Sequence, residues 1–311
     1  MRDLAQITRA PIFLVGDLRD GGDGYAAAVV DALSRTRVAN RIIFEFFEPP
    51  REELLARIDG SIRHWGAELS PESHDETIRA LLGKAVYSNE QMEKSIEAIL
   101  GRRCEQLDLF FMVGLPGQTR ASVLATVDAV ERLFHCFDRR LSAFLTPMGP
   151  FIDPGSDGFE QAEARGYRIR ARTLAEHRAL LEQHDWESIL NYETRWMTRT
   201  EIVSATYDGA ERLNELKART GRLAPQRAAA VAARLHAARN LRERIAAAGG
   251  RGDLDPEIHR ALLGQIRAFS EATLNDKTEL FPPGAFLANF RIGGILRLLA
   301  REMFRRPVRA R

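Results

Sequence analysis

Polar residues that could do chemistry recur where short apolar runs of this sequence end. They are Asp17, Glu48, Ser70, Glu72, Ser73, Gln118 and Asp153. The carboxyl ends of parallel strands form the rim on which α/β folds build their sites, and carboxylates there can bind hydroxyl groups, an ammonium group or a cation. Loops are also polar simply because they are solvated. The pattern favours a functional rim and solvated loops about equally.

A glycine-rich turn, Gly114-Leu-Pro-Gly-Gln-Thr119, follows the apolar run 109–113. It is too short for a P-loop and lacks the lysine that a P-loop requires. The backbone of such a turn can approach a flat ligand closely, and Thr119 is expected to cap the helix that follows.

Cysteine and histidine usage limits the metal chemistry. Cys104 and Cys136 are the only cysteines, and none of the seven histidines lies at metal-ligand spacing from another. Three closely spaced thiolates are therefore missing, so we expect no metal site and no iron–sulfur cluster held by this chain alone. The residue types and spacing identify no catalytic residue.

Composition excludes several classes of protein. The 311 residues include 45 Lys+Arg and 43 Asp+Glu, for a net charge of +2, and 45% are hydrophobic. These values exclude a disordered chain and a disulfide mini-protein, and the near-zero charge argues against a dedicated nucleic-acid binder. The sequence shows no secretory signal and no apolar run long enough to span a bilayer, which predicts a cytoplasmic location.

The first half alternates apolar runs with amphipathic stretches. Strands are predicted at 12–15, 41–47, 67–71, 109–113 and 141–145, and helices at 24–35, 52–64, 74–82, 89–100 and 119–133. Near-continuous apolar strands alternating with helices are typical of a parallel sheet covered by helices. The predicted fold class is α/β: a partial (β/α) TIM-like barrel of about five parallel strands, followed by an all-α C-terminal region.

Three domains or segments are expected: a partial barrel at 1–155, a helical bundle or cap at 156–280, and a basic amphipathic tail at 281–311. Helices are predicted throughout the second segment, at 172–184, 198–218, 224–247 and 255–274. The aromatic-rich stretch 186–197 between them is interpreted as core rather than as a wall of the substrate site.

The tail carries seven arginines against Glu302 between residues 286 and 311. A basic amphipathic helix can lie on anionic lipid or bind an acidic partner, but arginines also snorkel over neighbouring helices. Gly293-Gly294 weakens the helix, so the pattern favours snorkelling over peripheral membrane contact.

Two stretches resemble radical S-adenosylmethionine (SAM) enzymes. Glu68–Arg79, with Gly83-Lys84 and Tyr87–Glu90 after it, resembles the fourth-strand region of this family, and more narrowly of the subgroup with an N-terminal cobalamin-binding domain. Asp108–Thr119 is similar to the family's fifth strand. With Gly16-Asp17 on a second strand, the resemblance covers roughly residues 10 to 155.

The resemblance implies a SAM site. Gly16 and Asp17 would lie near the methionine group. Glu72, Ser73 and Lys84 would lie near the ribose and carboxylate, and Gly114, Pro116 and Gly117 near the adenine. Alternatively, Glu72 is an acid that stabilises a helix N-terminus, and Lys84 is a solvated surface lysine.

The sequence also departs from the family. Its members hold a [4Fe-4S] cluster on a CxxxCxxC loop after the first strand, and in this subgroup cobalamin on an upstream domain; neither set of ligands is present here. We therefore expect this chain to be the C-terminal part of a B12-dependent-type enzyme and to be inactive alone. A missing N-terminal half or a separate subunit would be needed for activity. The expected reaction is radical methylation or related chemistry on an unknown small-molecule substrate. An unpaired edge is expected at Ile12–Val15.

Two alternatives remain. The chain can be a cluster-free SAM- or nucleotide-binding protein, or a scaffold, that acts as a partner subunit. It can also be an unrelated (β/α) enzyme whose rim carboxylates Asp17, Glu48, Glu72 and Asp153 bind a divalent cation.

Overall fold

The computed structural model describes residues 2–36, 38–83, 87–183, 185–247, 274–275, 279 and 290–303. The chain divides into two compact units. Unit 1 comprises Met1–Leu69, Lys94–Leu107 and Thr278–Arg311, and unit 2 comprises Ser70–Glu93 and Asp108–Lys277.

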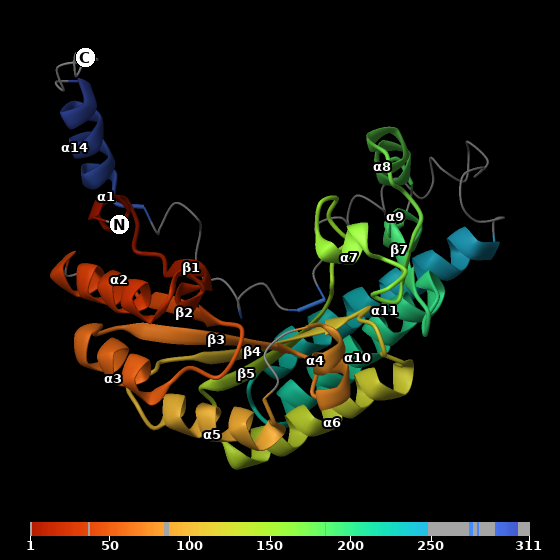
Figure 1. Ribbon diagram of the computed structural model, residues 1–311, viewed down its shortest axis with the longest axis horizontal. Coiled ribbons are helices and arrows are strands. Elements are labelled where there is room, and N and C mark those ends of the chain that lie inside the picture. Colours follow the sequence, from red (N-terminus) through yellow and green to blue (C-terminus); the bar gives the residue numbers. More distant parts are fainter. Residues whose placement is uncertain are drawn as a thin grey trace. The chain divides into compact units, whose positions relative to one another are not determined.

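Five parallel strands form one sheet in the order β1-β2-β3-β4-β5 (Figure 1). They are β1 (Ile12–Asp17), β2 (Ile42–Phe46), β3 (Trp65–Glu72), β4 (Leu107–Val113) and β5 (Leu141–Pro147). Helices alternate with these strands, and the C-terminal region is helical, which confirms the predicted partial TIM-like barrel fold class. The prediction succeeds because most of these strands are local apolar runs, and the central strands of the sheet are largely buried.

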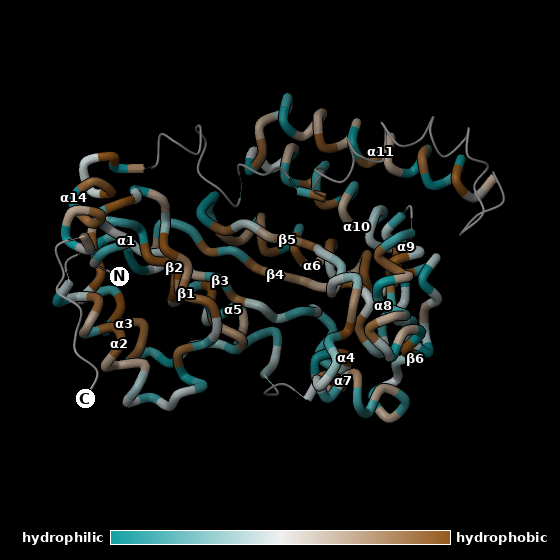
Figure 2. Tube along the Cα trace, turned by 90° about the horizontal axis from the view of Figure 1, so that it is seen from above, coloured by the Kyte–Doolittle hydropathy of each residue, from teal (hydrophilic) through white to brown (hydrophobic). Residues whose placement is uncertain are grey.

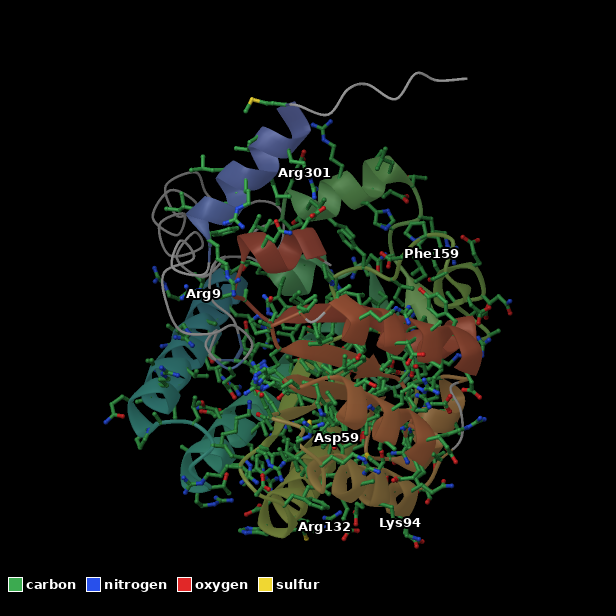
Figure 3. The ribbon with its side chains drawn as sticks, turned by 90° about the vertical axis from the view of Figure 1, so that its left-hand side faces the viewer. Arg9, Asp59, Lys94, Arg132, Phe159 and Arg301 are labelled. Atoms are coloured by element: carbon green, nitrogen blue, oxygen red, sulfur yellow. The ribbon has the colours of Figure 1, made fainter. Side chains whose placement is uncertain are left out.

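Unit 1 contains β1, β2 and the first part of β3, with α2 (Asp23–Thr36) and α3 (Glu52–Ser61). Ile42 of β2 lies opposite Ile12 of β1 and Trp65 of β3. Asp59 of α3, labelled in Figure 3, accepts hydrogen bonds from the Trp65 indole at 3.1 Å and from the backbone N–H of Arg103 at 3.0 Å. These bonds hold α3 on the sheet.

The β1 strand lies at one edge of the sheet, and within the described part of the chain it pairs only with β2. Its Val15 side chain is 86% exposed, and Phe13 is exposed as well. The edge expected at Ile12–Val15 is therefore present, and it shows two apolar side chains to solvent.

The helices of unit 2 include α5 (Asn89–Leu100) in part, α6 (Arg120–Cys136), α10 (Arg199–Arg219) and α11 (Pro225–Ala247). The α10 helix packs on α6, α11 and β5. Gly209 of α10 makes this approach possible, because a Cβ there would collide with Leu145 and lie 3.2 Å from Val123. Hydrophilic and hydrophobic residues alternate along α11 (Figure 2), and its Arg239 pairs with Asp208 of α10 at 2.7 Å.

Two short strands correct the prediction that only helices follow residue 155. Besides α7 (Asp157–Glu160), α8 (Leu174–Leu181) and α9 (Trp186–Ile189), unit 2 contains β6 (Tyr167–Ile169) and β7 (Tyr192–Thr194). They pair antiparallel, with Tyr192 opposite Ile169. Strands of three residues are too short to show an alternating pattern in a sequence. The helix predicted at 255–274 lies outside the described residues except for residue 274.

The remaining described elements are α1 (Arg2–Ile7), the 3-10 helix η1 (Leu18–Gly21), α4 (Glu76–Leu81) and α14 (Ile292–Met303). Within the ranges given above, no helix combines the length and the apolar character needed to cross a membrane.

Candidate functional site

Glu72, the last residue of β3, has a strained backbone. Its φ of 63° is the one positive value at a non-glycine residue in the described part of the chain. The left-handed region costs an L-residue about 1–2 kcal/mol. A tight turn follows, in which the N–H of Ser73 donates to the carbonyl of Pro71 at 2.7 Å. Such strain persists only where neighbouring structure enforces it, and it concentrates at functional sites.

Arg79 of α4 fixes this turn. Its guanidinium is buried and donates to the carbonyls of Ser73 at 2.8 Å and Tyr87 at 2.9 Å, and to the Asn89 side chain at 2.9 Å. It also lies 4.8 Å from the centre of the Tyr87 ring. Arg79 is therefore a positioning residue for Ser73 and, through it, for Glu72.

The glycine-rich turn after β4 is closed by Gln118. Its Oε1 accepts from the N–H groups of Gly114 and Leu115, both at 3.0 Å, and its Nε2 donates to the carbonyl of Met112 at 2.8 Å. These bonds use the polar groups of the buried Gln118 side chain, so this rim residue holds the turn. The predicted helix cap is confirmed, since Thr119 forms a capping box with Ser122 at the start of α6.

Both glycines of the turn have a positive φ, and Gly114 also lies against the rigid Tyr192 ring. Gly114 has a φ of 97°, and a Cβ there would lie 2.5 Å from the Tyr192 hydroxyl oxygen. Gly117 has a φ of 82°, and a Cβ there would lie 2.8 Å from Leu81. The turn is thus packed between β7 and α4.

Two buried tyrosines connect the Glu72 turn to the glycine-rich turn. The rings of Tyr167 and Tyr192 meet edge to face, with centroids 5.8 Å apart. Burial raises the pKa of both hydroxyls far above the ordinary value, and for Tyr167 the neighbouring Tyr192 and the charge of Glu72 raise the pKa further. Both therefore stay protonated near neutral pH and can donate a hydrogen bond.

The Tyr192 hydroxyl has no hydrogen-bond partner among the residues that the structure describes. A buried polar group left without a partner costs about 1–3 kcal/mol. A ligand that accepts a hydrogen bond beside Gly114 would remove that cost. The hydroxyl is thus a buried donor beside the glycine-rich turn whose hydrogen bond no described residue accepts.

The predicted site residues are divided between the two units, and one of them lies outside the described residues. Glu72, Ser73, Gly114, Pro116 and Gly117 belong to unit 2, where the tyrosine pair and α4 link the two turns. Gly16 and Asp17 belong to unit 1, and Lys84 lies outside the described residues. Their roles toward SAM stay predictions.

Asp17 is bound within its own unit. Its carboxylate accepts from the Arg19 side chain at 2.5 and 2.9 Å, from the Arg19 N–H at 2.9 Å and from the Phe47 N–H at 3.1 Å. Gly16, with a φ of 89°, donates its N–H to Glu45. Nowhere in the described ranges do three or more His, Cys, Asp or Glu side chains form a group that could hold a metal ion. Arg19 thus already neutralises the charge of Asp17, which is one of the four carboxylates that the divalent-cation hypothesis requires.

The Asp17 contacts predict an acid-sensitive contribution to stability. Burial raises the pKa of this carboxyl, but the hydrogen bonds and charge of Arg19 and the Phe47 N–H lower it more, so the pKa lies below the ordinary value. The stabilisation is therefore complete above the unfolded-state pKa of about 4 and is lost as the pH falls through the folded-state pKa. Chemical denaturation between pH 7 and pH 3 should show a steeper loss of unfolding free energy for the wild type than for Asp17→Asn. Parallel pH profiles would contradict this assignment.

The three expected cofactors differ in how well the residues of this chain could bind them. Cys104 is buried and Cys136 is exposed, and two cysteines cannot supply three thiolates for a [4Fe-4S] cluster. Cobalamin has no residue assigned to it from the sequence or the structure. A nucleoside-type ligand such as SAM fits better, because Glu72 brings a carboxylate to the end of β3 and the Tyr192 hydroxyl has no hydrogen-bond partner among the described residues.

Comparisons with known proteins find no match in sequence and several distant similarities in structure. No family model matches the sequence, and no curated protein matches it. A solved structure of the radical S-adenosylmethionine methyltransferase TsrM from Kitasatospora setae, with cobalamin and a [4Fe-4S] cluster bound, is similar at 14% identity and a TM-score of 0.44, over 66% of this chain and 42% of that one.

Two further structures are similar. TsrM from the same organism, with tryptophan substrate and a SAM analogue bound, matches at 16% identity and a TM-score of 0.41, over 56% of this chain and 34% of that one. Coproporphyrinogen III oxidase (HemN) from Escherichia coli, a radical SAM enzyme, matches at 12% identity and a TM-score of 0.35, over 57% of this chain and 47% of that one. This chain spans less than half of the length of each of the three matched chains.

Sequence reasoning missed three residues of this site: Arg79, Tyr167 and Tyr192. Tyr192 lies in the aromatic stretch that was interpreted as core, and its ring is indeed buried. Arg79 is part of the motif that carried the resemblance, but an arginine on a helix is usually exposed. Only its burial reveals its role.

Proposed function

We propose that unit 2 binds the nucleoside part of SAM, and that the chain is the SAM-binding portion of a radical SAM-type barrel of the B12-dependent subgroup. The observation that carries this proposal is the strained Glu72 at the end of β3, enforced by the Arg79-anchored turn. The resemblance of Glu68–Arg79 and Asp108–Thr119 to the family's fourth and fifth strands supports it.

Each proposed contact has a chemical reason. The Glu72 carboxylate can accept hydrogen bonds from ribose hydroxyls or from an ammonium group. The backbone at Gly114–Gly117 can lie against the adenine, and the Tyr192 hydroxyl can donate to a ring nitrogen. Bound SAM would supply the group that the family's radical chemistry transfers or cleaves.

The cluster must come from elsewhere, because this chain lacks its cysteines. We propose that a missing N-terminal half or a separate subunit brings the cluster and cobalamin. The β1 edge supports this, since an added strand there would pair with the edge and cover Val15 and Phe13. We also propose that the chain is organised in the three predicted segments, at residues 1–155, 156–280 and 281–311.

Glu72→Gly is expected to separate stability from binding. Glycine adopts a positive φ without strain, so the free energy of unfolding should stay unchanged or rise by up to about 1 kcal/mol. The affinity for SAM should fall about tenfold, because hydrogen bonds to a charged acceptor are lost. Isothermal titration calorimetry of the full chain without iron, together with urea unfolding, measures both.

Glu93→Gln is the matched control, because Glu93 is an exposed carboxylate on α5 of unit 2. It should change neither quantity. The proposal would be wrong if the wild type bound neither SAM nor S-adenosylhomocysteine, or if Glu72→Gly bound SAM as tightly as the wild type.

A second candidate is a cluster-free nucleotide-binding partner subunit. The two-cysteine content favours it, because binding would then need no iron. Competition between SAM and adenosine triphosphate in the same titration distinguishes the two functions. A preference for the triphosphate of tenfold or more would support the second candidate over the first.

A further inference from the structure

The α14 helix has an apolar stripe that the described part of the chain leaves exposed. Ile292, Leu296, Leu299 and Met303 are between 55% and 75% exposed. Their spacing of four, three and four residues places them on one face of the helix. Gly294, Ile295 and Leu298 are partly covered instead.

The covered side of α14 packs on α1 within unit 1 (Figure 1). Phe290 bridges to Thr8, the N–H of Arg291 donates to the carbonyl of Ile7 at 2.8 Å, and Arg301, labelled in Figure 3, pairs with Asp3 at 3.0 Å. These contacts hold the helix while the stripe stays exposed.

Of Gly293 and Gly294, which were expected to weaken this helix, Gly294 allows it to pack closely on α1. Gly293 and Gly294 lie in the first turn of α14, and a Cβ on Gly294 would collide with the backbone of Gln6. Gly294 therefore permits close packing on α1, and the stripe continues past both glycines without a break.

Charge and area indicate what covers the stripe. The sequence from 286 to 311 carries seven arginines and one acidic residue, Glu302. Four partly exposed aliphatic side chains present roughly 350 Å², which is below the roughly 800 Å² per partner of a stable protein interface. A lipid surface needs only shallow insertion of apolar side chains beside cationic ones.

We propose that α14 is an interfacial helix that binds this protein to an anionic lipid surface. The stripe inserts among the acyl chains, and Arg297 contacts the lipid phosphates. This proposal is independent of SAM binding.

Vesicle flotation with the full chain tests it. Binding is expected with vesicles of phosphatidylcholine mixed with phosphatidylglycerol, should weaken in high salt, and should be at least tenfold weaker with pure phosphatidylcholine. Leu296→Ser/Leu299→Ser should weaken binding at least tenfold, and Arg297→Gln about fivefold. Leu174→Ser on α8, which removes a leucine that is 88% exposed, is the matched control and should bind as the wild type does.

Three results would overturn the proposal. The first is equal binding of the wild type and the double variant, with circular dichroism showing both folded. The second is a wild-type dimer in sedimentation that the double variant loses, which would make a second copy the occupant. The third is salt-sensitive binding to polyglutamate with none to anionic vesicles, which would indicate an acidic protein partner.

Discussion

Replacing Gly114 by alanine is expected to lower the free energy of unfolding by about 3 kcal/mol. Two costs add. The φ of 97° is unfavourable for any residue with a Cβ, and that Cβ would lie 2.5 Å from the Tyr192 hydroxyl oxygen and 3.3 Å from two ring carbons. Because Tyr192 is fully buried on β7, its ring cannot move aside without disturbing the pair with Tyr167. Urea unfolding measures the loss.

A double-mutant cycle separates the two costs. Tyr192→Phe alone should leave stability unchanged or raise it by about 1 kcal/mol, because it removes a buried hydroxyl without a partner in the described structure. In the Gly114→Ala background it should restore about 1–2 kcal/mol, since the closest contact disappears while the backbone strain remains.

The same cycle tests the binding site. Tyr192→Phe should weaken SAM binding several-fold even though the protein is as stable as the wild type. Additive stability effects of the two substitutions would show that Tyr192 does not pack on Gly114. Unchanged binding in Tyr192→Phe would show that the hydroxyl does not contact the ligand.

Arg79→Lys is expected to cost about 3 kcal/mol, although the charge is kept. The guanidinium donates to the carbonyls of Ser73 and Tyr87 and to Asn89, and a lysine ammonium cannot span these acceptors from one position. Buried carbonyls left without donors account for the loss. SAM affinity should fall too, because the turn that enforces the Glu72 conformation is released.

Arg178→Lys is the matched control, since Arg178 lies on α8 with its side chain 81% exposed and paired with Glu182. It should change the unfolding free energy by less than about 0.5 kcal/mol. If Arg79→Lys were as mild as this control, the Ser73 turn would not depend on Arg79. If it destabilised the protein while SAM bound unchanged at a temperature where the chain is folded, Arg79 would be structural only.

Local patterns in the sequence determined the α/β class. Most strands of the parallel sheet are short apolar runs, and α5 occupies the predicted range Asn89–Leu100. The helix cap at Thr119 was also predictable, because a side-chain cap depends on residues within one turn. Information of this kind lies within about ten consecutive residues.

The tertiary structure alone decided which polar residues are committed to the fold. Asp17 and Gln118 both follow strands and both looked available for chemistry, yet Arg19 binds the first and the backbone of the glycine-rich turn binds the second. The sequence cannot show this, because the direction of a side chain decides whether its carboxylate or amide forms hydrogen bonds within the fold or stays available for a ligand.

The binding-site hypothesis depends on contacts between distant segments. Tyr192 meets Gly114 from 78 residues away in the sequence, and it does so from a strand too short to predict. The sequence by itself determined the sheet, the helices that cover it and the turns at the ends of its strands, since these follow from short-range apolar pattern and capping. Only the tertiary structure decided that Glu72 is strained, that Arg79 is buried and that the Tyr192 hydroxyl has no partner among the described residues. Long-range packing sets backbone strain, burial and hydrogen-bond satisfaction.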